Sequence, residues 1–251
     1  MADTKNTLLT HAFTLLDCFS FDQPEIGVRE AARITGLTTS TTGRLMTSLK
    51  EMGLLQQNPA TRAYRLGTKV LEWAGVVSAT LDIRTKALPY MSELHRKTHE
   101  TISLYVPEGN QRLCVERLES SYNVRIVSWV GRRLPLHAGS AGKAILAFMP
   151  EEQSSRLIDS MELIPFTDKT VTDGAALRAA IAEVRRLGYA VSHGEWLPEA
   201  SGVATAILNS RREVIGALCI SGPSQRFGED RLPGFIEGIL QATDRISKEV
   251  G

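Results

Sequence analysis

The sequence lacks any apolar run of the roughly 18 residues that a membrane-spanning helix needs. Its polar start, residues 1–6, has neither the basic first segment nor the apolar core of a signal peptide. The composition, 43% hydrophobic and 23% charged, is that of a globular protein. We therefore expect a cytoplasmic protein that makes no contact with a membrane.

Cysteine is scarce as well. Cys18, Cys114 and Cys219 lie far apart and form no CxxC pair, which argues against a disulfide framework or a zinc site. His95 and His99 are spaced like neighbours on a helix, but they lack a HExxH pattern and fit an ordinary amphipathic helix. We predict no metal ligands and no cofactor.

Neither sign of charge dominates, since the net charge is +1. Residues 1–70 hold eight Lys/Arg and six Asp/Glu, so this part carries +2 and the remainder −1. An excess this small does not by itself indicate a nucleic-acid partner. Any argument for DNA binding must therefore come from the pattern of residues.

That pattern lies near the N-terminus. Apolar residues recur at helical spacing over about 6–20, 28–34 and 39–52. Gly36 follows the second segment, where a left-handed residue commonly ends a helix, and a Thr/Ser cluster from Thr38 can cap the third. Two short helices joined by a tight turn containing glycine predict a helix-turn-helix.

The N-terminal residues of the second of these helices face the major groove in a helix-turn-helix. They are Thr39, Ser40, Thr41, Gly43 and Arg44. Small hydroxyl side chains can bond bases or phosphates, and an arginine can contact a guanine edge or a phosphate. Gly43 lies inside the predicted helix, where glycine costs roughly 1 kcal/mol relative to alanine.

Two short strands, 54–57 and 62–66, follow around a turn that contains Asn58 and Pro59. A helix-turn-helix followed by such a hairpin is a winged helix, and Arg62 and Arg65 on the wing are candidates for phosphate contacts. A three-helix packing module that binds no DNA is the structural alternative.

Several stretches resemble the isocitrate lyase regulator (IclR) family of bacterial transcriptional regulators. The similar stretches are 28–37, Ser40-Thr41 with Arg44-Leu45, Gly53-Leu54, 64–67, 131–144, 188–191 and 221–223, in the family's order. The resemblance covers essentially the whole chain. This chain differs from many family members at Thr39, Thr42 and Gly43, where they carry a basic residue, an aliphatic residue and often a histidine, respectively. The resemblance therefore does not identify which side chains of this helix read the bases.

The second half predicts an α+β domain, with helices packed on one sheet. Strands are expected at 101–106, 112–117, 124–129, 189–192, 203–208 and 214–221, and helices at 88–97, 140–148, 177–187 and 229–249. We predict a winged helix-turn-helix domain over 1–66, a linker helix over 67–82 with an apolar stripe, and an effector-binding domain over 83–251. The resemblance implies that this last domain is GAF-like.

A glycine-containing loop, 139–142, precedes one predicted helix, and free backbone N–H groups at a helix N-terminus favour an anion. A tight loop whose glycines serve only the turn is the alternative. The resemblance implies a small-molecule site formed by this loop and the last strands. Its residues are Ser140, Ala141, Ser192, Gly202, Cys219 and Ser221.

Two of these positions depart from the family. Ser192 stands where many relatives have an acid, and Gly202 leaves room where some carry a larger side chain. Both changes favour a ligand that is larger or more apolar than a two- or three-carbon acid, such as an aromatic acid. Trp129 and Trp196 are candidates for flat pocket walls, or are ordinary core tryptophans.

We expect a repressor of a catabolic operon that binds operator DNA and responds to a small carboxylate. The resemblance implies a homodimer, commonly a dimer of dimers. An activator of the same kind and a sensor that binds no DNA are the alternatives. An enzyme is disfavoured, because Ser140 has no GxSxG context and no group that would orient His137 or His193 as a base. Glu195 and Glu199 are interpreted as part of a solvated loop or helix start.

Overall fold

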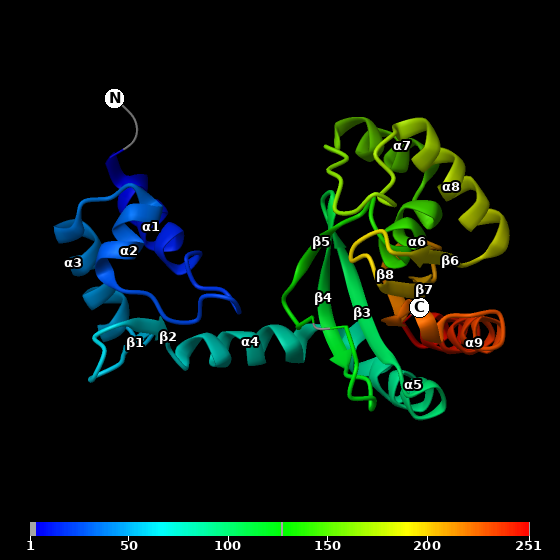
Figure 1. Cartoon of the computed structure of the whole chain (residues 1–251), viewed down its shortest axis with the longest axis horizontal. Coiled ribbons are helices and arrows are strands. Elements are labelled where there is room, and N and C mark those ends of the chain that lie inside the picture. Colours follow the sequence, from blue (N-terminus) through cyan, green and yellow to red (C-terminus); the bar gives the residue numbers. More distant parts are fainter. Residues whose placement is uncertain (1–3, 127, 251) are drawn as a thin grey trace. The chain divides into compact units, whose positions relative to one another are not determined.

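The computed structural model describes residues 4–126 and 128–250 (Figure 1). The chain divides into two compact units, residues 1–80 and 81–251, which are described separately. Within the described ranges, no helix combines the length and apolar character needed to cross a bilayer.

The first unit contains the predicted winged helix. Its elements in chain order are α1 (Thr4–Leu16), α2 (Val28–Thr35), α3 (Thr39–Glu51), β1 (Leu55–Gln57), β2 (Tyr64–Leu66) and α4 (Lys69–Thr80). The strands pair antiparallel with Leu55 opposite Leu66. Helix α1 ends at Leu16, four residues before the predicted end, because Phe19 turns back to bond the Leu16 carbonyl.

The turn between α2 and α3 has the predicted chemistry. Gly36 ends α2 with a φ of 72°, a left-handed conformation that glycine adopts without strain. The Thr38 hydroxyl accepts a hydrogen bond from the Thr41 N–H at 3.2 Å and so caps α3. Leu15, Ile26 and Met46 are fully buried between these helices and fix their packing.

Helix α4 lies within the range predicted for the linker helix, and the apolar stripe predicted there is exposed. None of its residues is buried, although the sequence places an apolar stripe there. Leu71 is 71% exposed, and Trp73, Val76 and Val77 are all more than half exposed. The apolar side of this helix is therefore uncovered in a single chain.

The second unit is built on one six-stranded antiparallel sheet. Its strands are β3 (Thr101–Glu108), β4 (Gln111–Leu118), β5 (Arg133–Pro135), β6 (Ala190–His193), β7 (Ala200–Leu208) and β8 (Val214–Pro223). They lie in the order β5-β4-β3-β8-β7-β6. The prediction of an α+β domain is confirmed.

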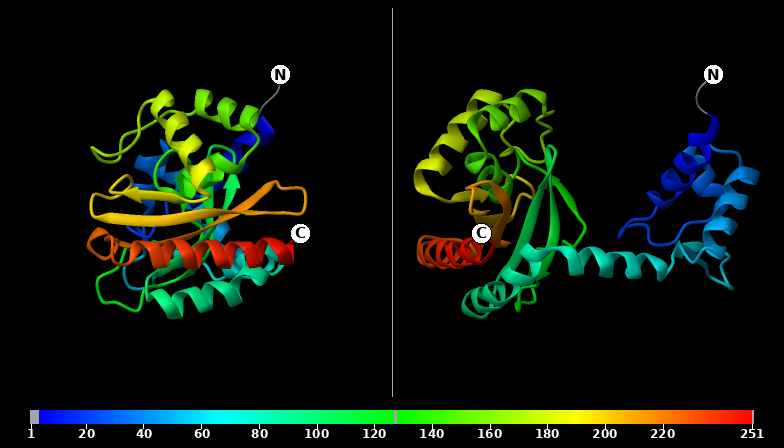
Figure 2. Two further views of the ribbon diagram at one scale, coloured as in Figure 1. Left: turned by 90° about the vertical axis from the view of Figure 1, so that its right-hand side faces the viewer. Right: turned by 180° about the vertical axis from the view of Figure 1, so that it is seen from behind.

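Helices cover both faces of this sheet (Figure 2). Helices α5 (Asp82–Thr98) and α9 (Leu232–Val250) pack on one face, and α6 (Ser140–Phe148) packs on the other, with α7 (Glu151–Ser160) and α8 (Gly174–Leu187) outside it. Alternate residues of β8 belong to two hydrophobic cores, one on each face of the sheet. Ala217 and Cys219 face α6, whereas Leu218 and Ile220 face α5 and α9.

Two sequence predictions fail in this unit. The predicted strand at 124–129 is not formed by the described residues of that segment, and β5 lies just beyond it. Arginine side chains, rather than a neighbouring strand, bond its backbone, since Arg226 donates to the Val124 carbonyl and Arg117 donates to the Ile126 carbonyl. Helix α7 was not predicted, because it holds only two apolar residues, Leu157 and Ile158, which are too few to establish a period.

Candidate functional site

The predicted DNA-contacting residues of the recognition helix lie on the N-terminal half of α3. Thr39, Ser40 and Arg44 are exposed, and Thr41 and Gly43 are half-buried. The Arg44 guanidinium donates a hydrogen bond to the Ser40 hydroxyl at 3.4 Å, so it lies along the exposed side of the helix. These side chains are accessible to a DNA groove.

The wing residues are also exposed. Arg62 has a φ of 62°, uncommon for a residue other than glycine, and its N–H bonds the Asn58 carbonyl to close the wing turn. Arg65 donates to the Gln56 side chain. Both arginines line one shallow surface depression together with Lys50 of α3, a third cation that the sequence argument did not single out.

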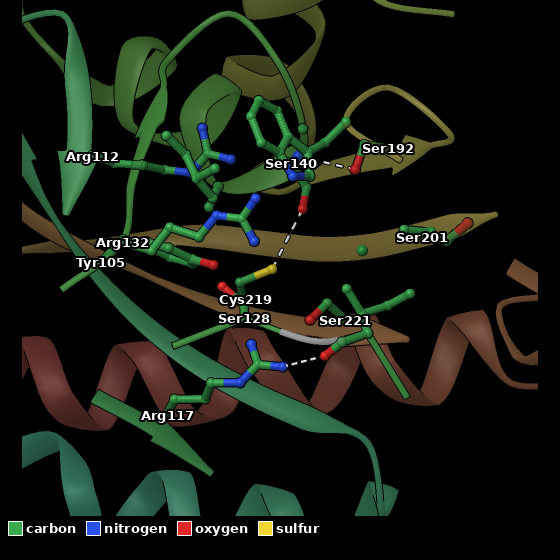
Figure 3. Close-up of a pocket in the computed structure, with 17 residues that line it drawn as sticks. Tyr105, Arg112, Arg117, Ser128, Arg132, Ser140, Ser192, Ser201, Cys219 and Ser221 are labelled. Atoms are coloured by element: carbon green, nitrogen blue, oxygen red, sulfur yellow. Dashed lines mark hydrogen bonds between the residues drawn. The ribbon is translucent and has the colours of Figure 1, made fainter. Parts of the chain in front are cut away.

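The second unit holds a pocket between the sheet and the N-terminus of α6 (Figure 3). It encloses about 590 Å³, its open mouth included. Six of the seven predicted effector residues line it, namely Ser140, Ala141, Ser192, Gly202, Cys219 and Ser221. Trp129 does not line it; Trp196 does.

The first turn of α6 is already partly occupied. The Ser140 N–H donates to the Ser192 hydroxyl at 3.0 Å, and the Ser140 hydroxyl contacts the Cys219 sulfur at 3.6 Å. The N–H of Gly139, at the N-cap, donates to a Glu195 carboxylate oxygen at 2.9 Å. Ala141 belongs to the same first turn, where backbone N–H groups have no carbonyl partner within the helix.

The interpretation of Glu195 as a solvated residue is wrong. Its side chain is buried and forms an ion pair with the equally buried Lys143 of α6. Lys143 also donates to the Val191 carbonyl at 3.1 Å, and the Thr170 hydroxyl donates to the Glu195 carbonyl at 2.7 Å. Glu199 remains exposed, as interpreted. Burial of a paired charge ties α6 to the segment after β6.

Three arginines line the pocket that the sequence argument did not identify: Arg112, Arg117 and Arg132. Arg112 is 4% exposed, donates to the Pro135 carbonyl, and lies over the Tyr105 ring with 5.3 Å between guanidinium and centroid. Arg117 donates to the Ser103 hydroxyl at 3.3 Å and to the Ile126 carbonyl. The pocket is therefore rich in positive charge.

A β-bulge explains why Arg112 and Arg117 share one face of β4. Residues five apart on a regular strand point to opposite faces of the sheet. The register of β4 with β3 shifts between Leu104 and Tyr105, which pair with Glu116 and Cys114 and leave Val115 as the extra residue. One extra residue restores Arg117 to the pocket face.

Aromatic rings close the outer wall. The Arg132 guanidinium lies 4.5 Å from the centroid of Trp129 and 5.4 Å from that of Trp196. The Trp196 ring also packs on Phe166, with centroids 4.2 Å apart. Trp129 thus contacts Arg132, which lines the pocket, and spacing along the sequence does not reveal this contact.

Burial shifts several titrating groups in the pocket. Desolvation raises the pKa of Tyr105 to about 12, and the thiols of Cys219 and Cys114 add to the rise. Desolvation likewise lowers the pKa of the Arg112 guanidinium and raises that of the Cys219 thiol. At neutral pH the tyrosine and the thiol stay protonated, so the arginines set the sign of charge in the pocket.

The geometry does not assemble a nucleophile and base. The His137 ring bonds the Ile164 carbonyl at 3.0 Å, and the His193 ring bonds the Ser201 hydroxyl at 2.8 Å, whereas Ser140 bonds elsewhere. His99 ends α5 in a left-handed conformation, and His95 bonds the Glu119 carbonyl. Among the described residues, no group of three suitable side chains could hold a metal ion.

A winged helix followed by an α+β unit with a charged pocket defines the class of DNA-binding transcriptional regulators. Residues 8–59 match the family model described as IclR helix-turn-helix domain, and residues 76–248 match the one described as Bacterial transcriptional regulator IclR C-terminal. The chain belongs to the IclR family, and it is a DNA-binding transcriptional regulator.

Curated relatives match along almost the whole length. The HTH-type transcriptional regulator KipR of Bacillus subtilis (strain 168) is 35% identical over 247 residues, 98% of this chain and 98% of its own. The HTH-type transcriptional regulator XynR of Escherichia coli (strain K12) is 32% identical, over 96% of this chain and 95% of its own. These relatives are transcriptional regulators rather than enzymes.

Among solved structures, an IclR homolog from Microbacterium hydrocarbonoxydans complexed with 4-hydroxybenzoate is 30% identical. The similarity covers 97% of this chain and 98% of that one, with a TM-score of 0.84. The α+β fold predicted for the second unit agrees with this similarity, which covers both units.

Proposed function

We propose that the chain is a repressor of a catabolic operon. We propose further that a small organic acid, bound in the pocket at the N-terminus of α6, lowers its affinity for operator DNA. The observation that carries the proposal is the first turn of α6, where Ala141 lies in the pocket lining beside buried Arg112 and its N–H has no carbonyl partner within the helix. Helix N-termini and guanidinium groups both favour carboxylates. Relatives named as repressors, the IclR and AllR proteins of Escherichia coli, support the direction of control.

The proposed acid is aromatic. Gly202 and Trp196 both line the pocket, and the Trp196 ring provides a flat apolar wall. The relative complexed with 4-hydroxybenzoate, an aromatic carboxylate, is consistent with such a ligand. The proposed contacts are Ser140, Ala141, Ser192, Gly202, Cys219 and Ser221, and no residue is assigned a catalytic role.

On the DNA side, the proposed contacts are Thr39, Ser40, Thr41, Gly43, Arg44, Arg62 and Arg65. The α3 residues would enter the major groove and the wing arginines would bond phosphates. Residues 1–66 would act as the DNA-binding domain, 67–82 as the linker helix and 83–251 as the effector domain. This division keeps each kind of contact within one domain.

We further propose a homodimer, with the second copy covering the apolar side of α1 and α4. Leu8, Phe13 and Trp73 line one apolar groove and are 63%, 64% and 52% exposed. A groove of this kind marks an interaction surface. Two winged helices in a symmetric dimer fit a pseudo-palindromic operator. Sedimentation should therefore show a dimer for the native chain and a monomer for Phe13→Ser with Trp73→Ser.

A mobility-shift titration tests the function. The native chain is mixed with DNA from upstream of its own gene, and a scrambled duplex of equal length serves as control. We expect sequence-dependent retardation that weakens when an effector acid, drawn from a panel of benzoates, is added. Retardation of both duplexes alike, or none, would overturn the proposal; strengthening by the acid would overturn the proposed direction of its effect on operator binding.

A further inference from the structure

The pocket carries more positive charge than one carboxylate needs. Arg112 and Arg117 both line it, and neither forms an ion pair with an acidic side chain of the described residues. Glu195, the acid nearest the α6 turn, is already paired with Lys143. Cations that line a partly buried pocket without acidic partners favour an anionic ligand, and two of them favour two anionic groups.

Both guanidinium groups have an N–H donor without a hydrogen-bond partner among the described atoms. The Nε atoms of Arg112 and Arg117 are buried and have no hydrogen-bond partner among the described atoms. Their bonds to Pro135, Ser103 and Ile126 use terminal nitrogens only. An arginine bonds a carboxylate through two parallel N–H groups, so a free Nε leaves one edge of each group able to take part.

The two arginines approach the pocket from different ends. They start from the same face of β4, roughly 13 to 16 Å apart along the strand. Figure 3 shows Arg112 beside the Ser140 end of the pocket, and Arg117 on the opposite side of Cys219, beside Ser128 and Ser221. The strand register agrees for Ser221, because Arg117 pairs with Ser103, and Ser103 pairs on its other side with Cys219, two residues before Ser221. Ser128 lies two residues after Ile126, whose carbonyl accepts from Arg117, and the Ser128 hydroxyl is buried without a partner among the described atoms.

We infer that the pocket has a second anion subsite, formed by Arg117 with Ser128 and Ser221, and that its ligand is a dicarboxylate. One carboxylate lies at the α6 turn near Arg112, and the other lies at Arg117. This inference rests on the proposed function, since it names the ligand class of the same pocket. It adds the requirement for a second charged group at the far end of the acid.

Calorimetric titration of the full chain with matched acids tests the subsite. The probes are benzoate, isophthalate and terephthalate, with hexanoate and adipate as an aliphatic pair, and phenyl phosphate as a dianion charged at one end only. We expect at least one diacid to bind at least about tenfold more tightly than its monoacid, the order of one charge-assisted hydrogen bond.

The variant Arg117→Gln should abolish this preference, because diacid affinity falls to that of the matched monoacid while monoacid affinity falls much less. Retained monoacid binding also shows that the pocket has kept its fold. Arg117→Lys, which keeps the charge, should retain part of the preference. Arg211→Gln, an exposed arginine in the β7–β8 turn, is the matched control and should behave as the native chain.

Equal affinity for monoacids and diacids, or a preference that survives Arg117→Gln, would overturn the second subsite and leave the proposed function intact. Tighter binding of phenyl phosphate than of any diacid would also overturn it, because the two charges would then belong to one end. If no probe binds, the second subsite and the acid-controlled function fail together.

Discussion

The carboxylate of Glu195 accepts a hydrogen bond from the Gly139 N–H, 2.9 Å away, at the N-terminus of α6. The chain thus supplies its own anion to the turn that the sequence offered as an anion site. The same carboxylate pairs with Lys143 one turn along the helix. At the proposed site, a ligand acid would therefore meet the remaining donors of this turn, in a geometry that a buried ion pair holds in place.

Replacing Glu195 by glutamine should strongly destabilise the second unit. Lys143 would then be a buried cation without an acidic partner, and breaking such a pair costs about 3–5 kcal/mol. Urea unfolding followed by circular dichroism measures the loss. Glu199→Gln, an exposed neighbour, should change stability by less than about 0.5 kcal/mol. Equal effects of the two variants would refute the structural role of the pair.

Adding Lys143→Met to Glu195→Gln should restore part of the stability, because it removes the lone charge and leaves an apolar chain of similar length. A double variant less stable than Glu195→Gln alone would show that Lys143 acts mainly through the Val191 carbonyl instead.

A methyl group at Gly202 should obstruct the pocket. A Cβ atom there would lie 2.9 Å from the Ser140 hydroxyl and 3.2 Å from the Ile220 carbonyl oxygen, closer than ordinary contacts. We expect Gly202→Ala to lower acid affinity about tenfold or more while operator binding without acid stays unchanged. Gly234→Ala, with open space around its Cβ, is the control. Undiminished acid binding by Gly202→Ala would place the ligand elsewhere.

Tyr105 should make the chain sensitive to alkali. Burial raises its pKa from 10.0 to about 12, so the folded state keeps the phenol protonated longer than the unfolded state does. This contribution is fully present below pH 10 and is lost as the pH rises towards 12, amounting to roughly 2 to 3 kcal/mol. Between pH 10 and 12, the urea midpoint of unfolding should fall less for Tyr105→Phe than for the native chain. Equal falls in the two midpoints would show that Tyr105 does not contribute to the loss of stability.

Arg44→Ala should weaken operator binding by about 1–3 kcal/mol and leave acid affinity unchanged. The Arg44 side chain is exposed on α3, and its guanidinium donates a hydrogen bond to the Ser40 hydroxyl. Fluorescence anisotropy with a labelled operator measures the first effect and calorimetry the second. Loss of acid binding with intact operator binding would reverse the roles of the two units.

Gly43→Ala separates stability from recognition. Its Cβ would lie 3.6 Å from Val28, an ordinary contact, and the helix would gain up to about 1 kcal/mol from the better propensity. We expect a higher melting temperature with unchanged operator binding, since the added methyl would face Val28 of α2 rather than the groove. A lower melting temperature would show that α2 and α3 pack too closely for any side chain there.

Local sequence signals identified the winged helix well, because they act within a few residues. Gly36 and Thr38 mark the turn and the cap whatever the rest of the chain does. In the second unit the strands that alternate apolar residues were found, but the strand predicted at 124–129 was not. The carbonyls of that segment are bonded by Arg117 and Arg226, which no local pattern encodes.

The pocket was predicted only in part for the same reason. Its loop and strand residues followed from resemblance, and six of the seven line one cavity. The arginines were missed because the bulge at Val115 decides which face Arg117 occupies, and a period-two pattern assigns it to the other. Burial of Glu195 depends on Lys143, 52 residues away in the chain. Long-range pairs of this kind need a structure.

The central claim is that acid in the pocket and operator on the winged helix are coupled through one chain. Coupling is reciprocal, so the factor by which saturating acid changes operator affinity must equal the factor by which saturating operator changes acid affinity. We would measure both by titrating the same preparation with the tightest-binding diacid and the chain's own operator. We expect the two affinity factors to be equal and to lie between about 5 and 150, with acid weakening the operator complex. Tight binding of both acid and operator, with neither changing the affinity for the other, would contradict this coupling.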